Sequence, residues 1–307
     1  MRQVQERGQN KRGIHQTIDM EEELKINGKA LYSTKGAAKE YGRIGCNFYT
    51  GCPNGCEYCY LKRGAPSKLL GGTEVRLKKC FKDEADAEYQ FNKELLKWYD
   101  QCKKYGIFLS FTTDPLIFET RELTRQAIIN ALFNDVPVYI LTKDASFIND
   151  ECGFMAWMDN ILIPSRDLVH FGFTLTGRDD LEPNASKNAD RIKAMRKMAR
   201  KGFQTFASIE PVIDWKSAER MVEESLPWCD HYKLGLRSGV GRKYYNMAES
   251  VSAVDRIIRM CEENNRTIYL KESTRKLLQR VYVPRAFRQM LTHTVDMDGK
   301  RITNNNP

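Results

Sequence analysis

The segment GCPNGCEYCY, residues 51–60, places Cys52, Cys56 and Cys59 in a loop rich in Gly, Pro and Asn. Three cysteines at this spacing can bind three irons of a cubane. A cluster with four cysteine ligands is saturated and suits electron transfer, whereas three ligands leave one iron open for substrate chemistry. The segment therefore predicts a 4Fe–4S cluster with one open iron on these three cysteines.

Zinc is the structural alternative for this loop. A structural zinc ion takes four tetrahedral ligands, which usually come as paired Cys-x-x-Cys or Cys/His sets. The sequence has no second pair nearby, and His15 is distant along the chain. Cys46 is a candidate fourth ligand, but it lies six residues before the loop in an expected strand, where we expect it to pack. The spacing favours three ligands and an open iron.

The chain has 307 residues and nine cysteines. Its N-terminus carries charge but lacks the apolar core of a secretory signal, and no apolar run reaches the roughly 18 residues that span a bilayer. We therefore expect a cytoplasmic protein without membrane contact, where a disulfide framework is improbable. The remaining cysteines stand singly among apolar or helical neighbours and are predicted to pack: Cys80, Cys102, Cys152, Cys229 and Cys261.

Short β-rich segments alternate with helical patterns from Arg43 onward, which predicts βαβ units and a parallel sheet. The expected strands are nearly continuous apolar runs, as in sheets covered on both faces. No glycine-rich dinucleotide fingerprint follows the first strand. The sequence thus predicts an α/β fold, a partial (β/α) barrel of about seven parallel strands: 43–48, 107–112, 136–142, 169–174, 203–209, 232–236 and 267–270.

Three regions follow from this reading. Residues 1–42 are expected to form an irregular N-terminal extension with a short helix around Ile18–Leu24, residues 43–282 the barrel, and residues 283–307 a polar, frayed tail. The helical patterns predicted within the barrel cover 83–105, 121–133, 146–159, 188–201, 215–226, 248–262 and 273–281.

Polar side chains close the apolar runs of the expected strands. In barrels, the chemistry lies at the carboxyl ends of the strands. A convergence of polar groups there suits a zwitterionic nucleoside ligand. The candidates are Thr112, Thr113, Asp114, Thr142, Lys143, Thr174, Thr176, Glu210, Arg237, Ser238, Lys271 and Glu272.

The cysteine loop has the form CxxxCxΦC, with the aromatic residue Tyr58 before the third cysteine. This pattern, placed after the first strand, resembles the signature of the radical S-adenosylmethionine superfamily. More closely, the sequence is similar to the spore photoproduct lyase-like branch, often labelled DNA repair photolyases. The similarity extends over roughly residues 41–271, through NFYTGCPNGCEYCY (47–60), FTTDP (111–115), ILTKDA (140–145), FTLTGRDDLEPNAS (173–186) and SIEPVID (208–214).

The resemblance implies a full or partial (β/α) barrel with S-adenosylmethionine at the strand ends. It also implies reductive cleavage of that cofactor to a 5′-deoxyadenosyl radical, fed by an external one-electron donor of the flavodoxin or ferredoxin type. Lys143 is then expected to pair with the methionine carboxylate. The other expected cofactor contacts are Thr112, Thr113 and Thr174 with the amino group or ribose, Glu210 with ribose or substrate, and Tyr58 with adenine.

One departure limits the functional expectation. Spore photoproduct lyases proper carry a hydrogen-donating cysteine on the second strand, but residues 109–114 read LSFTTD here. Repair of a thymine lesion by that route is therefore not expected.

The net charge of +9 is concentrated at the chain ends. Residues 271–307 carry eight Lys or Arg against three Asp or Glu, and residues 1–43 carry nine against six. Because basic regions attract polyanions, we rank a DNA or RNA substrate first. The alternatives are radical modification of a peptide or small molecule, and a non-catalytic zinc or Fe–S binding module.

Overall fold

The computed structural model describes residues 24–63, 67–150, 153–160, 163–241, 243–280 and 284–303. Its main sheet has the strand order β1-β2-β5-β6-β7-β8-β9-β10, in which β1 runs antiparallel to β2 and all other neighbours are parallel. The predicted α/β fold, a partial barrel of parallel strands, is confirmed. The strands are β1 (Leu31–Ser33), β2 (Ile44–Cys46), β5 (Ile107–Leu109), β6 (Val138–Thr142), β7 (Val169–Thr174), β8 (Gln204–Val212), β9 (His231–Leu236) and β10 (Thr267–Leu270).

Helices connect the successive parallel strands. A separate two-stranded sheet pairs β3 (Tyr49–Thr50) with β4 (Arg76–Leu77). The α-helices are α1 (Ser67–Leu70), α2 (Glu84–Lys97), α3 (Tyr99–Tyr105), α4 (Phe118–Phe133), α5 (Phe154–Asp159), α6 (Ile163–Arg166), α7 (Asn188–Arg200), α8 (Trp215–Ser225), α9 (Met247–Glu263), α10 (Glu272–Leu278) and α11 (Pro284–Leu291). The 3₁₀ helices are η1 (Gly36–Glu40), η2 (Tyr60–Lys62), η3 (Ser146–Asn149), η4 (Asp179–Leu181) and η5 (Leu226–Trp228).

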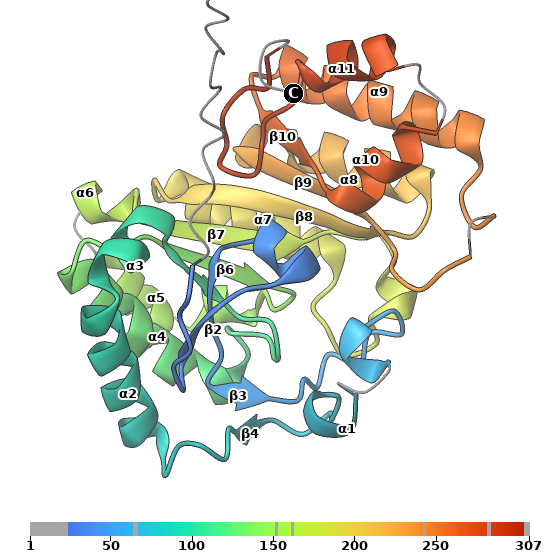
Figure 1. The fold of residues 1–307 in the computed structure, drawn as a ribbon. Helices are drawn as coiled ribbons and strands as arrows, with labels where there is room; N and C mark the ends of the chain where they lie inside the picture. The colour runs from blue at the N-terminus through green and yellow to red at the C-terminus, as the bar shows by residue number, and fades with distance from the viewer. Residues whose placement is uncertain are drawn as a thin grey trace, which may run out of the picture.

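The helices follow the strands along the sheet, with α2–α5 beside its first strands and α8–α11 beside its last (Figure 1). Helix α9 illustrates why they form: the Asn246 side chain accepts a hydrogen bond from the Glu249 amide and caps the helix. The buried side chains of α9 recur at helical spacing, at Ser250, Ala253, Val254, Ile257, Ile258 and Cys261.

No helix in the described ranges is both long and apolar enough to cross a membrane.

Two predicted helices are interrupted. The pattern over 83–105 forms α2 and α3 with a break at Trp98, whose backbone angles (φ −116°, ψ 36°) are not helical. The pattern over 146–159 gives only η3 and α5.

The second predicted strand, 107–112, is shorter in the structure. Strand β5 ends at Leu109, and the Asn47 side chain accepts a hydrogen bond from the Phe111 amide. The Phe111 amide therefore bonds to a side chain and not to a neighbouring strand.

The described part of the N-terminal extension, from residue 24, contains strand β1 and helix η1, so it is more regular than predicted. Strand β1 pairs with β2, and the buried Glu94 carboxylate of α2 accepts hydrogen bonds from the amides of Lys29, Ala30 and Leu31 at 2.6, 3.0 and 2.8 Å. The helix expected around Ile18–Leu24 lies outside the described residues except at its last position.

The prediction of a frayed C-terminal tail is wrong for residues 284–303, the described part of that tail. Helix α11 buries Phe287 and Leu291, and Val295 forms a parallel bridge with Tyr269 of β10. The tail therefore extends the last edge of the sheet.

The cysteines outside the loop mostly pack as expected. Cys46, Cys102, Cys229 and Cys261 are buried in the core. Cys80 is exposed, so the prediction that it packs is wrong. Cys152 lies outside the described residues.

We expect Glu94→Ala to lower the free energy of unfolding by about 2–3 kcal/mol, because it leaves buried backbone N–H groups without an acceptor. Urea unfolding followed by circular dichroism measures this change. The exposed residue Glu224 provides the control, since its substitution by Ala should shift stability by less than about 0.5 kcal/mol. Equal effects of the two substitutions would contradict this role of Glu94.

Candidate functional site

A cavity of about 730 Å³ opens at the carboxyl ends of the parallel strands. Its wall combines the cysteine loop with the residues that follow β5, β6 and β10. Among the strand-end candidates, Thr176, Arg237 and Glu272 do not line it. All nine residues singled out as cluster or cofactor ligands do line it: Cys52, Cys56, Tyr58, Cys59, Thr112, Thr113, Lys143, Thr174 and Glu210.

The cysteine loop requires its two glycines. Gly51 and Gly55 have positive φ angles of 83° and 71°, which L side chains rarely adopt. A Cβ atom on Gly51 would also lie 2.0 Å from the Glu74 carbonyl oxygen. The Cys52 amide donates to the Gly72 carbonyl at 2.9 Å, so residues 72–74 form the outer support of the loop.

Asp114 joins the cysteine loop to the strand ends. This buried carboxylate accepts hydrogen bonds from the Asn54 side chain at 3.0 Å and from the Lys143 amide at 2.7 Å. It also accepts from the Thr142 hydroxyl at 2.6 Å and from the Leu116 amide at 3.1 Å. One side chain therefore fixes the loop against β6 and the turn after β5.

The cysteines fit a cluster better than a single metal ion. Across the described residues, no three His, Cys, Asp or Glu side chains converge on a point that one ion could occupy. A cubane needs no such convergence, because each cysteine binds a different iron. Burial raises the pKa of the Cys52 thiol to about 12, and the Asp114 carboxylate adds to this rise. Cys46 belongs to the hydrophobic core and does not line the cavity, so the loop supplies three thiols.

The predicted cofactor residues present different polar groups. The Lys143 ammonium lies 5.6 Å from the centre of the Tyr58 ring, and the Tyr58 hydroxyl donates to Glu182. The Thr112 hydroxyl donates to the Tyr49 carbonyl at 2.5 Å. The Thr113 hydroxyl, by contrast, is buried without a hydrogen-bond partner in the described part of the chain. Such an orphaned group is a ready partner for a bound ligand.

Glu210 belongs to a separate cluster of polar side chains on the cavity wall. Its carboxylate accepts a hydrogen bond from Tyr41 and forms an ion pair with Lys271 at 2.5 Å. The Ser208 hydroxyl lies 2.6 Å from the Tyr41 hydroxyl, and the Lys271 ammonium lies 4.0 Å from the Tyr41 ring centre. Glu40 lies 3.6 Å from the same ammonium. We call Tyr41, Ser208, Glu210 and Lys271 the Tyr41 cluster.

Glu40 and Tyr41 were not predicted, because their segment has no periodicity and precedes the first expected strand instead of following a strand. The fold brings η1 against β10, where the Glu40 carboxylate accepts hydrogen bonds from the Tyr269 hydroxyl at 2.9 Å and the Glu272 amide at 2.6 Å. Glu182 was also missed, since it follows β7 only after a long loop.

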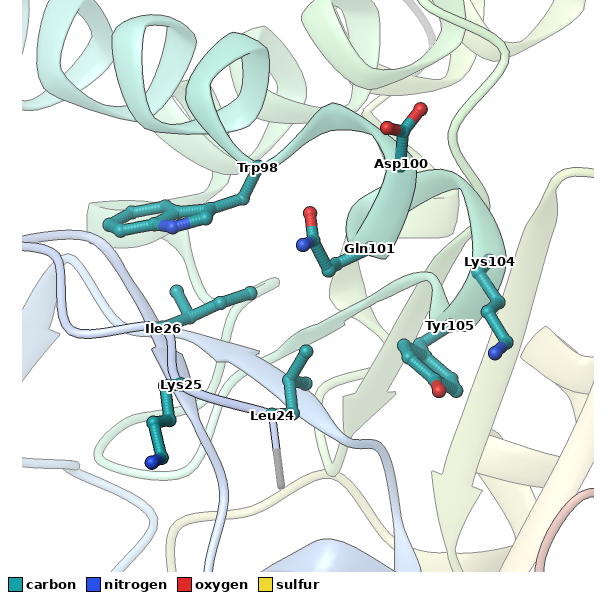
Figure 2. Close-up of a pocket in the computed structure, with 8 residues that line it drawn as sticks. All are labelled: Leu24, Lys25, Ile26, Trp98, Asp100, Gln101, Lys104 and Tyr105. Atoms are coloured by element: carbon teal, nitrogen blue, oxygen red, sulfur yellow. The ribbon is translucent and has the colours of Figure 1, made fainter. Parts of the chain in front are cut away.

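A second pocket, of about 500 Å³, lies between Leu24–Ile26 and α3 and is walled by Trp98 and Tyr105 (Figure 2). None of the predicted site residues lines it. The functional candidates therefore belong to the strand-end cavity.

No family model matches the chain. The chain is 26% identical over 212 residues to an uncharacterized protein of Methanocaldococcus jannaschii, a match that covers 65% of this chain and 73% of that protein. Among solved structures, a cysteine-to-alanine variant of spore photoproduct lyase with dinucleoside spore photoproduct superposes with a TM-score of 0.58, at 16% identity and 78% coverage of both chains. The chain has the fold of spore photoproduct lyase.

Streptococcus suis SuiB bound to S-adenosylmethionine is also similar, with a TM-score of 0.51 and 13% identity over 82% of this chain and 57% of SuiB. At these identities the likeness to SuiB and to spore photoproduct lyase is one of fold. The lyase-like barrel accounts for the position of the cavity, since strand ends converge there.

The buried Lys233, next to the Tyr41 cluster in this lyase-like barrel, links stability to pH. Burial, with a smaller contribution from the Lys271 charge, lowers the pKa of its ammonium to about 8. Between pH 8 and the ordinary lysine pKa, the unfolded chain binds more protons at this residue than the folded chain does. This residue therefore adds stability as pH rises through that window.

We expect the free energy of unfolding to rise more between pH 7.5 and 9.5 in the native protein than in a Lys233→Met variant. Urea titrations at both pH values measure the difference. Lys193→Met, at an exposed site on α7, should behave like the native protein. The same pH dependence in all three proteins would rule out a lowered Lys233 pKa.

Proposed function

We propose that this protein is a radical S-adenosylmethionine enzyme that holds a 4Fe–4S cluster on Cys52, Cys56 and Cys59. The observation that carries the proposal is the shared cavity: three thiols on one loop face the same space as Lys143 and the strand-end threonines. Three cysteine ligands leave one iron free for the amino and carboxylate groups of S-adenosylmethionine. Reductive cleavage to a 5′-deoxyadenosyl radical is the chemistry that this cofactor pair supplies.

The chain's own residues have distinct parts in this proposal. Lys143 presents a cation to the methionine carboxylate from within the cavity, where low dielectric strengthens the attraction. Thr113 offers its buried hydroxyl, which has no hydrogen-bond partner among the described residues, and Thr112 and Thr174 line the wall for the amino group or ribose. Tyr58 narrows the cavity beside Lys143. The electron comes from an external one-electron donor of the flavodoxin or ferredoxin type.

For the substrate we propose a nucleic acid whose base enters the cavity. Phe108 and Phe111 stack with their ring centres 4.6 Å apart, and Tyr41 lies 5.5 Å from Phe108, so one wall is aromatic. Bases stack on such surfaces in a sequence-tolerant way. The Tyr41 cluster offers polar partners for a base edge. Glu210 therefore serves the substrate in this proposal rather than the ribose.

The cavity rim supports the same substrate class. Tyr60 lines the cavity and is 53% exposed, and the exposed Lys62 and half-buried Lys78 lie on the same lining. An exposed aromatic ring next to cations is typical of single-stranded nucleic-acid sites. Residues 109–114 lack a cysteine, so the proposal does not extend to lesion repair by the lyase route.

Anaerobic reconstitution with iron and sulfide, followed by dithionite and S-adenosylmethionine, should yield 5′-deoxyadenosine. Cys56→Ala should abolish the product, because the cluster loses a ligand. Lys143→Met should keep its iron but bind S-adenosylmethionine about tenfold or more weakly, through loss of a charged contact. The matched control is Lys193→Met on the surface of α7. A protein that takes up one zinc ion and no iron would refute the proposal.

The loaded protein should bind a single-stranded oligonucleotide with an affinity that falls at least about tenfold between 50 and 200 mM salt. Replacing Lys62 and Lys78 together by Ala should flatten this salt dependence. Replacing Lys193 and Lys216 by Ala, at exposed positions that do not line the cavity, should not. Fluorescence anisotropy measures both. Absence of salt-sensitive binding to DNA and RNA would shift the substrate to a peptide or small molecule.

A further inference from the structure

The loop between β7 and α7, residues 177–187, lies directly against the cysteine loop. The Glu57 amide donates to the Leu181 carbonyl at 3.0 Å. Asn184 binds the loop twice: its side chain donates to the Pro53 carbonyl at 2.9 Å, and its amide donates to the Asn54 carbonyl at 3.3 Å. Residues 177–187 therefore form the inner support of the cysteine loop.

A fully buried ion pair anchors this support. The Arg191 guanidinium and the Glu182 carboxylate lie 2.7 Å apart, and both side chains are 0% exposed. The same guanidinium donates to the Thr174 carbonyl at 2.8 Å and to the Lys143 carbonyl at 3.2 Å. Arg191 thus joins the ends of β6 and β7 to the loop that carries Glu182. Burying two charges is costly, and a hydrophobic pair of similar volume is often as stable.

Tyr58 connects this ion pair to the cofactor end of the cavity. Its hydroxyl donates to Glu182, and its side chain packs in one small buried cluster with Cys56. Its ring faces the Lys143 ammonium. A carboxylate that fixes the Tyr58 hydroxyl therefore fixes the ring between a cysteine and the candidate carboxylate-binding lysine. Outer partners of metal ligands orient those ligands and tune the metal.

We propose that Glu182 and Arg191 are positioning residues that hold Tyr58 and so orient Cys56 and Lys143 toward the cluster and S-adenosylmethionine. The part of this inference that concerns the cluster and S-adenosylmethionine rests on the proposed function. The contacts among Glu182, Arg191 and Tyr58 do not depend on it. Lys143 and Arg191 together carry two positive charges against one on Glu182, so the assembly is also a net positive neighbour for an anionic cluster.

The first experiment uses the full-length protein without cluster and measures hydrogen–deuterium exchange. We expect Glu182→Gln to speed exchange in residues 51–60 about tenfold, since loss of one hydrogen bond corresponds to roughly that factor. Exchange in β9 should not change. Tyr58→Phe, which keeps the ion pair and removes only the hydroxyl, should loosen the same segment. Glu224→Gln, at an exposed site, is the matched control.

The inference would be overturned if Glu182→Gln speeded exchange throughout β7 and α7 while Tyr58→Phe left exchange in residues 51–60 unchanged. The Glu182–Arg191 ion pair would then only support the fold. Should Glu182→Gln fail to fold, the Tyr58→Phe result decides alone. These outcomes do not depend on iron. Failure of the proposed function would therefore be distinguishable from failure of this inference.

The second experiment uses the reconstituted protein and the electron paramagnetic resonance spectrum of its reduced cluster. Glu182→Gln should retain iron, lose the spectral change on adding S-adenosylmethionine, and bind that cofactor about tenfold more weakly. Removing a nearby negative charge should also raise the midpoint potential of the cluster. A spectrum, potential and affinity equal to those of the native protein would contradict the positioning role.

Discussion

The buried Asp114 carboxylate is the contact on which the arrangement of the cavity depends. Its two oxygens accept hydrogen bonds from the cysteine loop, from the end of β6 and from the turn that leads into α4. A buried carboxylate left without these donors would be strongly destabilising. The three segments are therefore held at fixed positions around one point. The cysteine loop lies over the strand ends as a consequence.

Charge balance shapes both ends of the cavity. The fully buried Glu182 is neutralised by Arg191 and the partly buried Glu210 by Lys271, so both carboxylates are paired as desolvation demands. Lys143 differs from these cations, because its ammonium faces an aromatic ring and the cysteines. An anionic ligand would complete its environment. In the proposed function, the same reasoning assigns the cofactor to the end of the cavity near Lys143 and the substrate to the Tyr41 cluster.

The described segments that precede β2 and follow α11 pack against the barrel. Segment η1 reaches β10 through Glu40, and the C-terminal tail bridges β10 through Val295. Both contacts lie at the last edge strand of the open sheet, where unpaired backbone groups would otherwise face solvent. Neither was predicted, because terminal segments without periodicity contain little local information about where they pack.

Local sequence patterns determined many of the secondary-structure elements and the cysteine loop of this protein. Apolar runs fixed the strands β7 and β10 to the residue, and the cysteine spacing with its two glycines fixed the loop, since both are dictated by backbone conformation and burial over a few positions. Lys143 follows β6 as predicted, whereas Glu210 lies within the last residues of β8 and not after it, and both line the cavity wall. Only the tertiary structure decided their partners. Tyr41 meets Glu210 across 169 positions and Tyr58 meets Glu182 across 124, and such contacts follow from how the elements pack, which no local pattern encodes.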